Sequence, residues 1–489
     1  MLFNSYVYIL IFLPAALAGY FWLNRLHYVT AAKAWLVGAS LFFYGYWNPA
    51  YLTLILLSVF VNFGVGTALG APAERRRRPR VARQAVLSAG ILFNLGLLGY
   101  YKYADFFIRN VNTVFSTDLP LLRLVLPLAI SFFTFQQIAY LVDSYRRETE
   151  EFDFLSYALF VTFFPQLIAG PIVHHQEMMP QFADLRRKVF NPRNVALGLF
   201  IFAIGLFKKV MVADEFGVWA TNAFDTAPSL GFFEAWSASL CYTFQLYFDF
   251  SGYTDMAIGS ALMFNIALPI NFNSPYKALD IADFWRRWHM TLSRWLRNYL
   301  YIPLGGNRLG ALQTYRNLFI TFLLGGLWHG AAWTFVAWGA LHGVAAALHR
   351  LWRDAGMRMP RVMAWLVTFV FVDVAWVFFR AKTFADALKV LKGMVGLGGF
   401  TLPEWTEGLL GSLAPSAVGF GDPLLSVGGG RSIYFYLVGS ILVVAFARNS
   451  VELGARFRPN LVHGAVTVGL LTAGVLHLAR LSEFLYFNF

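Results

Sequence analysis

Cysteine is almost missing from this sequence. The 489 residues include a single cysteine, Cys241, so no disulfide can form within the chain and no site can bind a metal ion through several cysteines. A lone thiol could carry an acyl group. Cys241 lies in an apolar stretch, however, where a thiol stays protonated and unreactive. We therefore interpret Cys241 as a packing residue.

Charged residues are also scarce, at 13% of the chain against 58% hydrophobic residues. This balance is far more apolar than that of a soluble protein. Runs long enough to cross a bilayer, about 20 residues each, recur along the chain. The first run lacks a preceding basic segment and a following cleavage site, which indicates a retained span rather than a signal peptide. The clearest predicted spans are 6–23, 31–46, 51–69, 85–101, 362–379, 434–446 and 462–478.

Acidic residues are fewer than basic ones, with 26 against 39, and the net charge of +13 could suggest nucleic-acid binding. The basic residues lie in short connectors between apolar runs rather than on one soluble face. Lys and Arg accumulate in loops that stay in the cytoplasm, so membrane topology explains the charge. We expect membrane lipid as a partner and no nucleic acid.

The basic connectors predict the orientation of the chain. Arginines cluster at 75–80 and crowd two later connectors, 350–361 and 448–458. If all three face the cytoplasm, both chain termini and the Gly-rich segment 384–431 face the periplasm. The sequence thus predicts a multi-pass membrane protein.

The middle third of the chain is less regular. Pro, Gly and paired charges interrupt the apolar runs at 168–171, 207–209 and 271–306. Irregular backbone at membrane depth is tolerated only where protein buries it or water reaches it, so we expect half-membrane helices and a cavity here. We predict one all-α domain, 1–489, with N-terminal spans at 1–145, a catalytic core at 150–350 and C-terminal spans at 362–489.

The densest polar stretch runs from Asp280 to Tyr299. At helical spacing its Trp, Leu and Tyr side chains form an apolar stripe, which indicates an amphipathic helix. Such a helix could lie at the membrane interface with its arginines at head-group level. Alternatively, the arginines could line the cytoplasmic mouth of a cavity and bind a phosphate-bearing donor through forked hydrogen bonds. The candidate arginines are Arg286, Arg287 and Arg294.

One imidazole, that of His329, lies inside an otherwise apolar run with glycines around it. An ionisable group at such a position is a functional candidate by default. A neutral imidazole can act as general base for an alcohol that attacks an acyl carbonyl. The glycines permit close approach of a neighbouring helix or of a thin substrate. A core histidine that hydrogen-bonds to another helix is the alternative.

Other polar residues inside apolar stretches are Asp249, Asp255, His174 and His175. The aspartates could bind a metal or orient a histidine, but no paired carboxylates or His-x-x-x-His motif accompany them. Adjacent histidines point in different directions on most backbones, which argues against a shared ion. We expect no metal site.

Several motifs occur together in one order. They are PQLIAGP at 165–171, DFWRRWHMTLSRWL at 283–296, YLYIPLGGN at 299–307, LWHG at 327–330 and FLYFNF at 484–489. Together they resemble the bacterial membrane-bound O-acyltransferases (MBOATs), most closely those that acetylate alginate. The resemblance covers nearly the whole chain.

The resemblance implies a helical bundle around a central funnel, with the catalytic histidine at His329 and a second motif histidine at His289. It implies no bound cofactor and a cytoplasmic acyl donor, with acetyl-CoA as the expected substrate. The acyl group would pass through the bundle to a periplasmic acetyltransferase of the serine-hydrolase (SGNH) type, which O-acetylates an exopolysaccharide. Alginate is the expected polymer.

The expected reaction is acyl transfer. Nε2 of His329 would take a proton from a hydroxyl, while His289 or a backbone donor stabilises the oxyanion. Acetylation of cellulose or peptidoglycan, D-alanylation of teichoic acid and, outside the enzyme class, a polysaccharide exporter or a structural subunit remain alternatives. The expected donor-binding residues are Trp285, Arg286, Arg287, Arg294, Asn298 and Trp328.

Cysteine labelling in a Cys241→Ala background checks the predicted orientation. An Arg77→Cys probe should react with an impermeant maleimide only after cell lysis, because the basic cluster is expected in the cytoplasm. An Asn48→Cys probe, in a connector without Lys or Arg, should react in intact cells. Labelling of position 77 from outside would show that the orientation is wrong.

Overall fold

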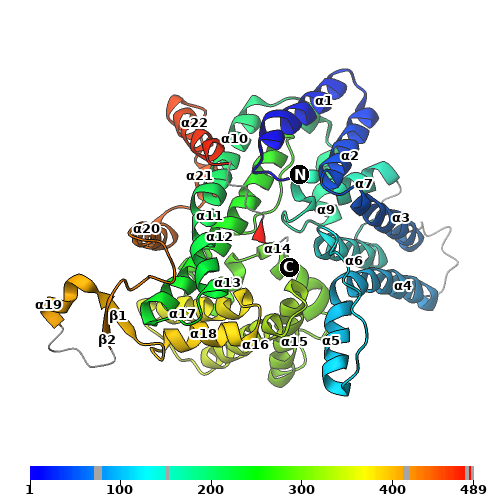
Figure 1. Ribbon diagram of the computed structural model, residues 1–489. Coiled ribbons are helices and arrows are strands. Elements are labelled where there is room, and N and C mark those ends of the chain that lie inside the picture. Colours follow the sequence, from blue (N-terminus) through cyan, green and yellow to red (C-terminus); the bar gives the residue numbers. More distant parts are fainter. Residues whose placement is uncertain (71–79, 150–152, 411–417, 479–483, 486–489) are drawn as a thin grey trace. The chain divides into compact units, whose positions relative to one another are not determined.

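The computed structural model describes residues 1–70, 80–149, 153–410, 418–478 and 484–485. Most of the predicted arginine cluster at 75–80 and most of the 484–489 motif therefore lie outside the described residues. The regular secondary structure of the described chain is helical, apart from one two-stranded parallel sheet (Figure 1). The predicted all-α fold is confirmed.

The chain forms two compact units. Unit 1 consists of Met1–Leu206, Tyr253–Asn271 and Gly454–Asn488, and unit 2 of Phe207–Gly252 and Phe272–Leu453 together with Phe489. The long helix α12, Phe232–Met263, contributes residues to both. The single domain inferred from the sequence stays a prediction.

Unit 1 is built from helices of the two ends of the chain and the stretch between them. Its elements are η1 Tyr8–Phe12, α1 Leu13–Arg25, α2 Val29–Gly45, α3 Ala50–Gly70, α4 Arg80–Leu98, η3 Gly99–Tyr103, α5 Ala104–Phe115, α6 Ile130–Arg146, α7 Phe154–Thr162, α8 Phe164–Leu167, α9 His175–Ala183, η4 Leu185–Lys188, α10 Pro192–Phe207 and α22 Leu461–Leu476. The short α21, Ser450–Ala455, begins in unit 2 and ends in unit 1.

Unit 2 holds the polar stretch and the apolar run around His329. Its elements are η5 Lys208–Ala213, α11 Asp214–Thr221, η6 Asn222–Thr226, η7 Pro275–Lys277, α13 Ile281–Arg287, α14 Met290–Leu296, η8 Arg297–Tyr301, α15 Ala311–His329, α16 Trp333–Asp354, α17 Arg361–Arg380, α18 Phe384–Met394, β1 Phe400–Pro403, η9 Glu404–Thr406, α19 Glu407–Leu410, β2 Val418–Gly421 and α20 Ser432–Phe446.

All seven predicted spans coincide with helices. Five helical segments of the described chain are long and apolar enough to cross a membrane, and three further apolar helices are shorter. The five are Tyr8–Arg25, Ala50–Gly70, Val81–Phe115, Pro192–Thr226 and Arg361–Arg380, and the shorter three are Val29–Gly45, Ser432–Phe446 and Leu461–Leu476.

Two pairs of buried polar residues are hydrogen-bonded to each other inside unit 1. Asn62 of α3 and Asn94 of α4 are buried and exchange two amide hydrogen bonds, of 3.1 and 2.6 Å. Tyr8 and Ser260 share a buried hydroxyl–hydroxyl hydrogen bond of 2.7 Å. Such pairs join helices in an apolar surrounding, where an unpartnered polar group is costly.

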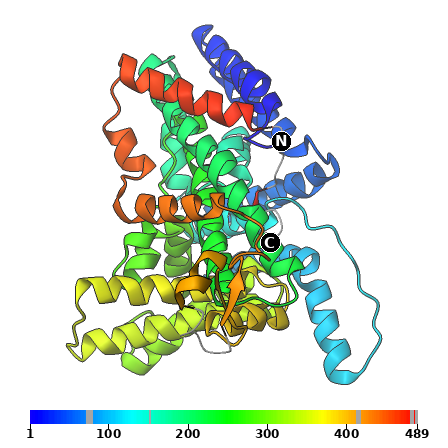
Figure 2. The same cartoon turned by 60° about the vertical axis from the view of Figure 1, so that its left-hand side comes forward.

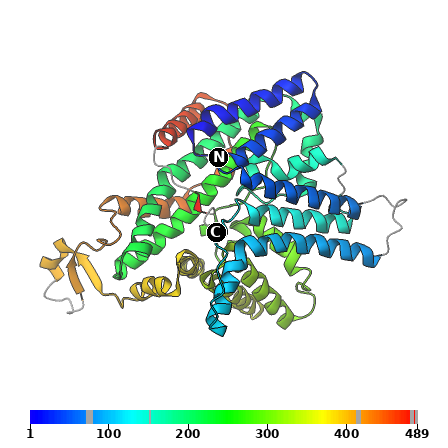
Figure 3. The same cartoon turned by 45° about the vertical axis from the view of Figure 1, so that its right-hand side comes forward.

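The segment 384–431 of unit 2 contains α18, α19 and both strands. β1 pairs with β2 in parallel, with Phe400 opposite Val418. The strand pair lies at the edge of unit 2 (Figure 3). Lys389 of α18 donates to the carbonyls of Ala223 and Ala227 at 3.1 and 2.7 Å. Burial lowers the pKa of Lys389, while Asp386 and Asp225 act to raise it.

Candidate active site

A close contact between two helices positions His329, the last residue of α15. A Cβ atom at Gly326 would lie 2.3 Å from the carbonyl oxygen of Phe335, and one at Gly339 would lie 2.5 Å from that of Phe322. Only glycine lets the backbones of α15 and α16 approach this far. The expectation that glycines near His329 permit close approach is thus confirmed, and the approaching element is α16.

A third glycine, Gly330, follows His329 directly. Its φ of −159° is open to any residue, so conformation does not require glycine here. The lack of space does require glycine, because a Cβ atom at Gly330 would lie 2.1 Å from the ring of Phe335. That ring packs edge-on against Phe379 of α17, with ring centroids 4.9 Å apart.

Aromatic rings surround the His329 side chain, which is 3% exposed. The ring centroids of Trp328, Trp338 and Phe379 lie 4.9, 5.3 and 5.0 Å from that of the imidazole. They come from α15, α16 and α17. Figure 2 shows α16 and α17, in yellow-green and yellow, side by side. The imidazole therefore sits where three helices meet.

The second motif histidine, His289, lies near the first. It is fully buried, and its ring centroid is 6.3 Å from that of His329 and 6.2 Å from that of Trp328. Phe250 of α12 packs edge-on against it at 4.8 Å. The structure thus brings together three of the residues that the sequence analysis named: His289, Trp328 and His329.

The polar stretch is not one continuous amphipathic helix, so that prediction is wrong. α13 ends at Arg287 and α14 begins at Met290, and His289 between them has a left-handed backbone with φ of 42°. A non-glycine residue in this region is strained and persists only where its surroundings fix it. The break turns the imidazole of His289 into the core of unit 2. The helices between 271 and 306 are all short, and the expectation that they span half the membrane stays a prediction.

Two of the expected donor-binding arginines share one carboxylate. Arg287 pairs with Asp283 at 2.9 Å and donates to the carbonyl of Asn273 at 3.3 Å. Arg286 is 3.4 Å from the same carboxylate and its side chain is 66% exposed. Arg294 of α14 and Asn298 of η8 are partly buried. A role for these side chains in donor binding stays a prediction.

Trp285 contacts a histidine that the sequence analysis did not single out. Its indole Nε1 donates to Nδ1 of His342 on α16 at 3.2 Å, and both side chains are buried. The ring of Trp338 lies 4.7 Å from that of His342 and 5.3 Å from that of His329. The sequence did contain a signal for His342. Trp338 and His342 are four residues apart, so they share one face of α16.

The other polar residues inside apolar stretches have structural partners. In unit 2, Asp249 and Asp214 each lie 2.6 Å from the buried ammonium group of Lys209. In unit 1, His174 is 3.8 Å from Asp143, and His175 hydrogen-bonds to Thr149. Among the residues that the structure describes, no three His, Cys, Asp or Glu side chains gather as a metal site would require.

His289 and His329 thus lie close together in unit 2, buried among aromatic rings. The sequence profile of the membrane-bound O-acyltransferase (MBOAT) family matches residues 93–385, and the chain belongs to this family. It is an O-acyltransferase bound to the membrane.

Three relatives of this chain have names that describe different acyl-transfer reactions. The chain is 47% identical to the peptidoglycan O-acetyltransferase of Helicobacter pylori, over all of this chain and 98% of that protein. It is 39% identical to the probable alginate O-acetylase AlgI of Azotobacter vinelandii, over 89% of this chain and 86% of that protein. A teichoic acid D-alanyltransferase of Streptococcus thermophilus is 27% identical, over 46% of this chain and 57% of that protein.

The glycine contact between α15 and α16 can be tested by thermal unfolding of the detergent-purified protein. Gly326→Ala should lower the unfolding temperature, because overpacking of this kind costs about 1–3 kcal/mol. Gly325→Ala is the matched control, since a Cβ there would lie 3.3 Å from the end of the flexible Leu296 side chain. Equal unfolding temperatures for both variants would contradict the close contact.

Proposed function

We propose that the protein is an inner-membrane O-acetyltransferase that takes an acetyl group from cytoplasmic acetyl-CoA and passes it toward peptidoglycan in the periplasm. The observation that carries the proposal is the pair His289 and His329, buried 6.3 Å apart among aromatic rings. The acceptor follows from similarity: identity to the peptidoglycan O-acetyltransferase exceeds identity to the alginate O-acetylase and extends over the full chain. Alginate, the polymer expected from the sequence, is the second candidate.

The proposed chemistry uses both histidines. Nε2 of His329 takes the proton of an acceptor hydroxyl, whose oxygen attacks the thioester carbonyl. The ring of His289 is close enough to His329 for both to contact one reacting group, so it donates a hydrogen bond to the oxyanion. The C–O bond then forms, the C–S bond breaks, and the proton on His329 goes to the departing sulfur.

Replacement of His329 tests this assignment. His329→Ala should lower acetyl transfer roughly 10²- to 10⁴-fold, the usual contribution of a placed general base, and leave gel-filtration behaviour unchanged. Transfer is measured with radiolabelled acetyl-CoA and the purified protein. The control is His477→Ala, an exposed histidine in unit 1. In cells that lack the wild-type gene, loss of O-acetyl groups from peptidoglycan supports the acceptor, whereas loss only from alginate favours the second candidate.

The donor-binding proposal concerns Arg294, which lies five residues after His289 and one helical turn into α14. Arg294→Gln should weaken acetyl-CoA binding and make the remaining affinity less sensitive to salt, because fewer charge contacts are left to screen. Binding is measured by calorimetry at two salt concentrations. Arg358→Gln, in an exposed connector, is the control. Unchanged affinity in a folded Arg294→Gln protein would favour the interfacial role of this segment.

We further propose that a periplasmic partner of the SGNH type receives the acetyl group before the polymer does. Support comes from the topology inferred from charge and from the resemblance to alginate acetylation enzymes. Liposomes containing the protein, with acetyl-CoA on the side of the basic loops and polymer on the other, should acetylate the polymer only after the partner is added. Efficient acetylation without partner would contradict the relay, and the His329→Ala protein controls for nonenzymatic transfer.

A further inference from the structure

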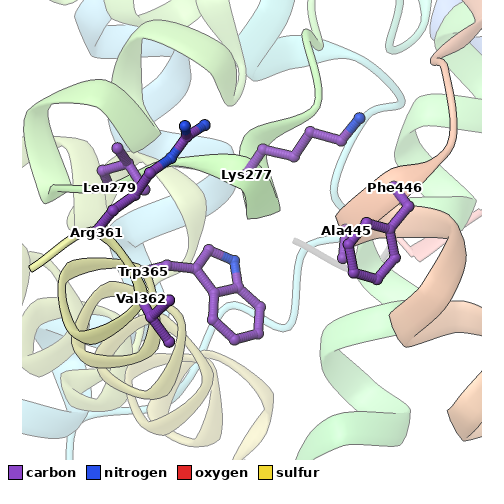
Figure 4. Close-up of a pocket in the computed structure, with 7 residues that line it drawn as sticks. All are labelled: Lys277, Leu279, Arg361, Val362, Trp365, Ala445 and Phe446. Carbon is purple, nitrogen blue, oxygen red and sulfur yellow. The ribbon is translucent and has the colours of Figure 1, made fainter.

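A cavity of about 320 Å³ lies within unit 2, apart from the residues assigned to acyl transfer (Figure 4). It is bordered by the first turn of α17, the last turn of α20 and the short helix η7. This volume is in the range of small-molecule sites. The lining residues used below are Lys277, Arg361, Val362, Trp365, Ala445 and Phe446.

Hydrogen bonds join the three elements around the cavity. The ammonium group of Lys277, at the end of η7, donates to the carbonyl of Ala447, which follows α20, at 2.6 Å. The indole Nε1 of Trp365 in α17 donates to the carbonyl of Tyr276 in η7 at 2.8 Å. The walls of the cavity are therefore fixed to one another, as a binding site requires.

The cavity carries positive charge. Within the part of the chain that the structure describes, no carboxylate lies at ion-pair distance from Lys277 or Arg361. One of the three ammonium protons of Lys277 is used by Ala447, and the others can bind a ligand. Figure 4 shows the cationic groups of Lys277 and Arg361 on the same side of the Trp365 ring.

The opposite part of the lining is apolar and open to the surroundings. Val362 of α17 is 77% exposed and Phe446 of α20 is 78% exposed. In a membrane-bound family, exposed apolar side chains on helices of this kind face lipid chains rather than water. The predicted topology places this end of both helices at the cytoplasmic membrane surface, where anionic lipids attract Lys and Arg.

We propose that this cavity binds an anionic phospholipid, with the phosphate at Lys277 and Arg361 and the acyl chains along Val362 and Phe446. The two cationic side chains match the anionic head group of such a lipid, and the apolar lining matches its acyl chains. A nucleotide-bearing donor such as acetyl-CoA also carries phosphates. It has no long acyl chain, however, to contact the apolar lining that is open to the bilayer. The inference depends on membrane embedding of α17 and α20 and not on the proposed acceptor.

Native mass spectrometry of the purified full chain, titrated with phosphatidylglycerol and with phosphatidylcholine, tests the proposal. The wild type should prefer phosphatidylglycerol. Arg361→Gln should weaken that binding roughly fivefold, the fold-change that corresponds to ~1 kcal/mol per cation at a membrane surface. Arg358→Gln, an exposed arginine of the same connector that does not line the cavity, should bind as the wild type does.

A second variant tests the cavity without changing charge. Ala445→Trp should fill the space and remove the preference for phosphatidylglycerol, with an unfolding temperature near that of the wild type. Equal binding of both lipids by the wild type, or equal losses in Arg361→Gln and Arg358→Gln, would overturn the proposal. It would also be overturned if acetyl-CoA displaced phosphatidylglycerol and bound more weakly to Arg361→Gln, since the cavity would then belong to the donor.

Discussion

The direct backbone contact between α15 and α16 is the constraint on which the candidate active site depends. Gly326 and Gly339 leave no room for a Cβ atom on either side, so van der Waals contact between the two backbones is continuous there. Within a bilayer the hydrophobic effect does not drive helices together, and close packing of this kind provides much of the cohesion. The contact also sets the distance between the rings of His329 and Trp338. A larger residue in the contact would therefore move the imidazole of His329 relative to its aromatic neighbours.

Aromatic contacts around His329 also fix the position of a third helix, α17. Trp338 stacks on Trp376 of α17 with centroids 5.5 Å apart and an interplanar angle of 17°. Phe379, one turn further along α17, contacts both Trp338 and His329. Because stacked and edge-on rings have defined geometries, the imidazole of His329 is held by shape as well as by its own backbone. A general base gains most of its effect from such fixed placement.

The sequence predicted the long apolar helices well and the backbone of the candidate active site poorly, for physical reasons. A span is encoded by the length and apolarity of one continuous run, which is local information. The turn at His289 contains no glycine or proline, so nothing local marks it. Its left-handed conformation is compatible with the tertiary packing of Phe250 and Trp328 around the ring. The ion pairs of Asp249 depend on Lys209, which is distant in sequence and lies on another helix.

The motif from Asp283 to His289 illustrates how much of the candidate site depends on partners outside the local sequence. The carboxylate of Asp283 faces the arginines that follow it, so their positive charge is partly balanced within α13.

The aromatic residues of the same motif turn inward. Trp285 hydrogen-bonds to His342, and Trp288 packs on Trp376 with centroids 5.0 Å apart. The helix thereby has a charged side and an aromatic side, as its periodicity predicts. His289 lies four residues after Trp285, so a continued helix would place it on the aromatic side as well. α13 instead ends at Arg287, and His289 follows in a left-handed conformation with its ring centroid 6.3 Å from that of His329.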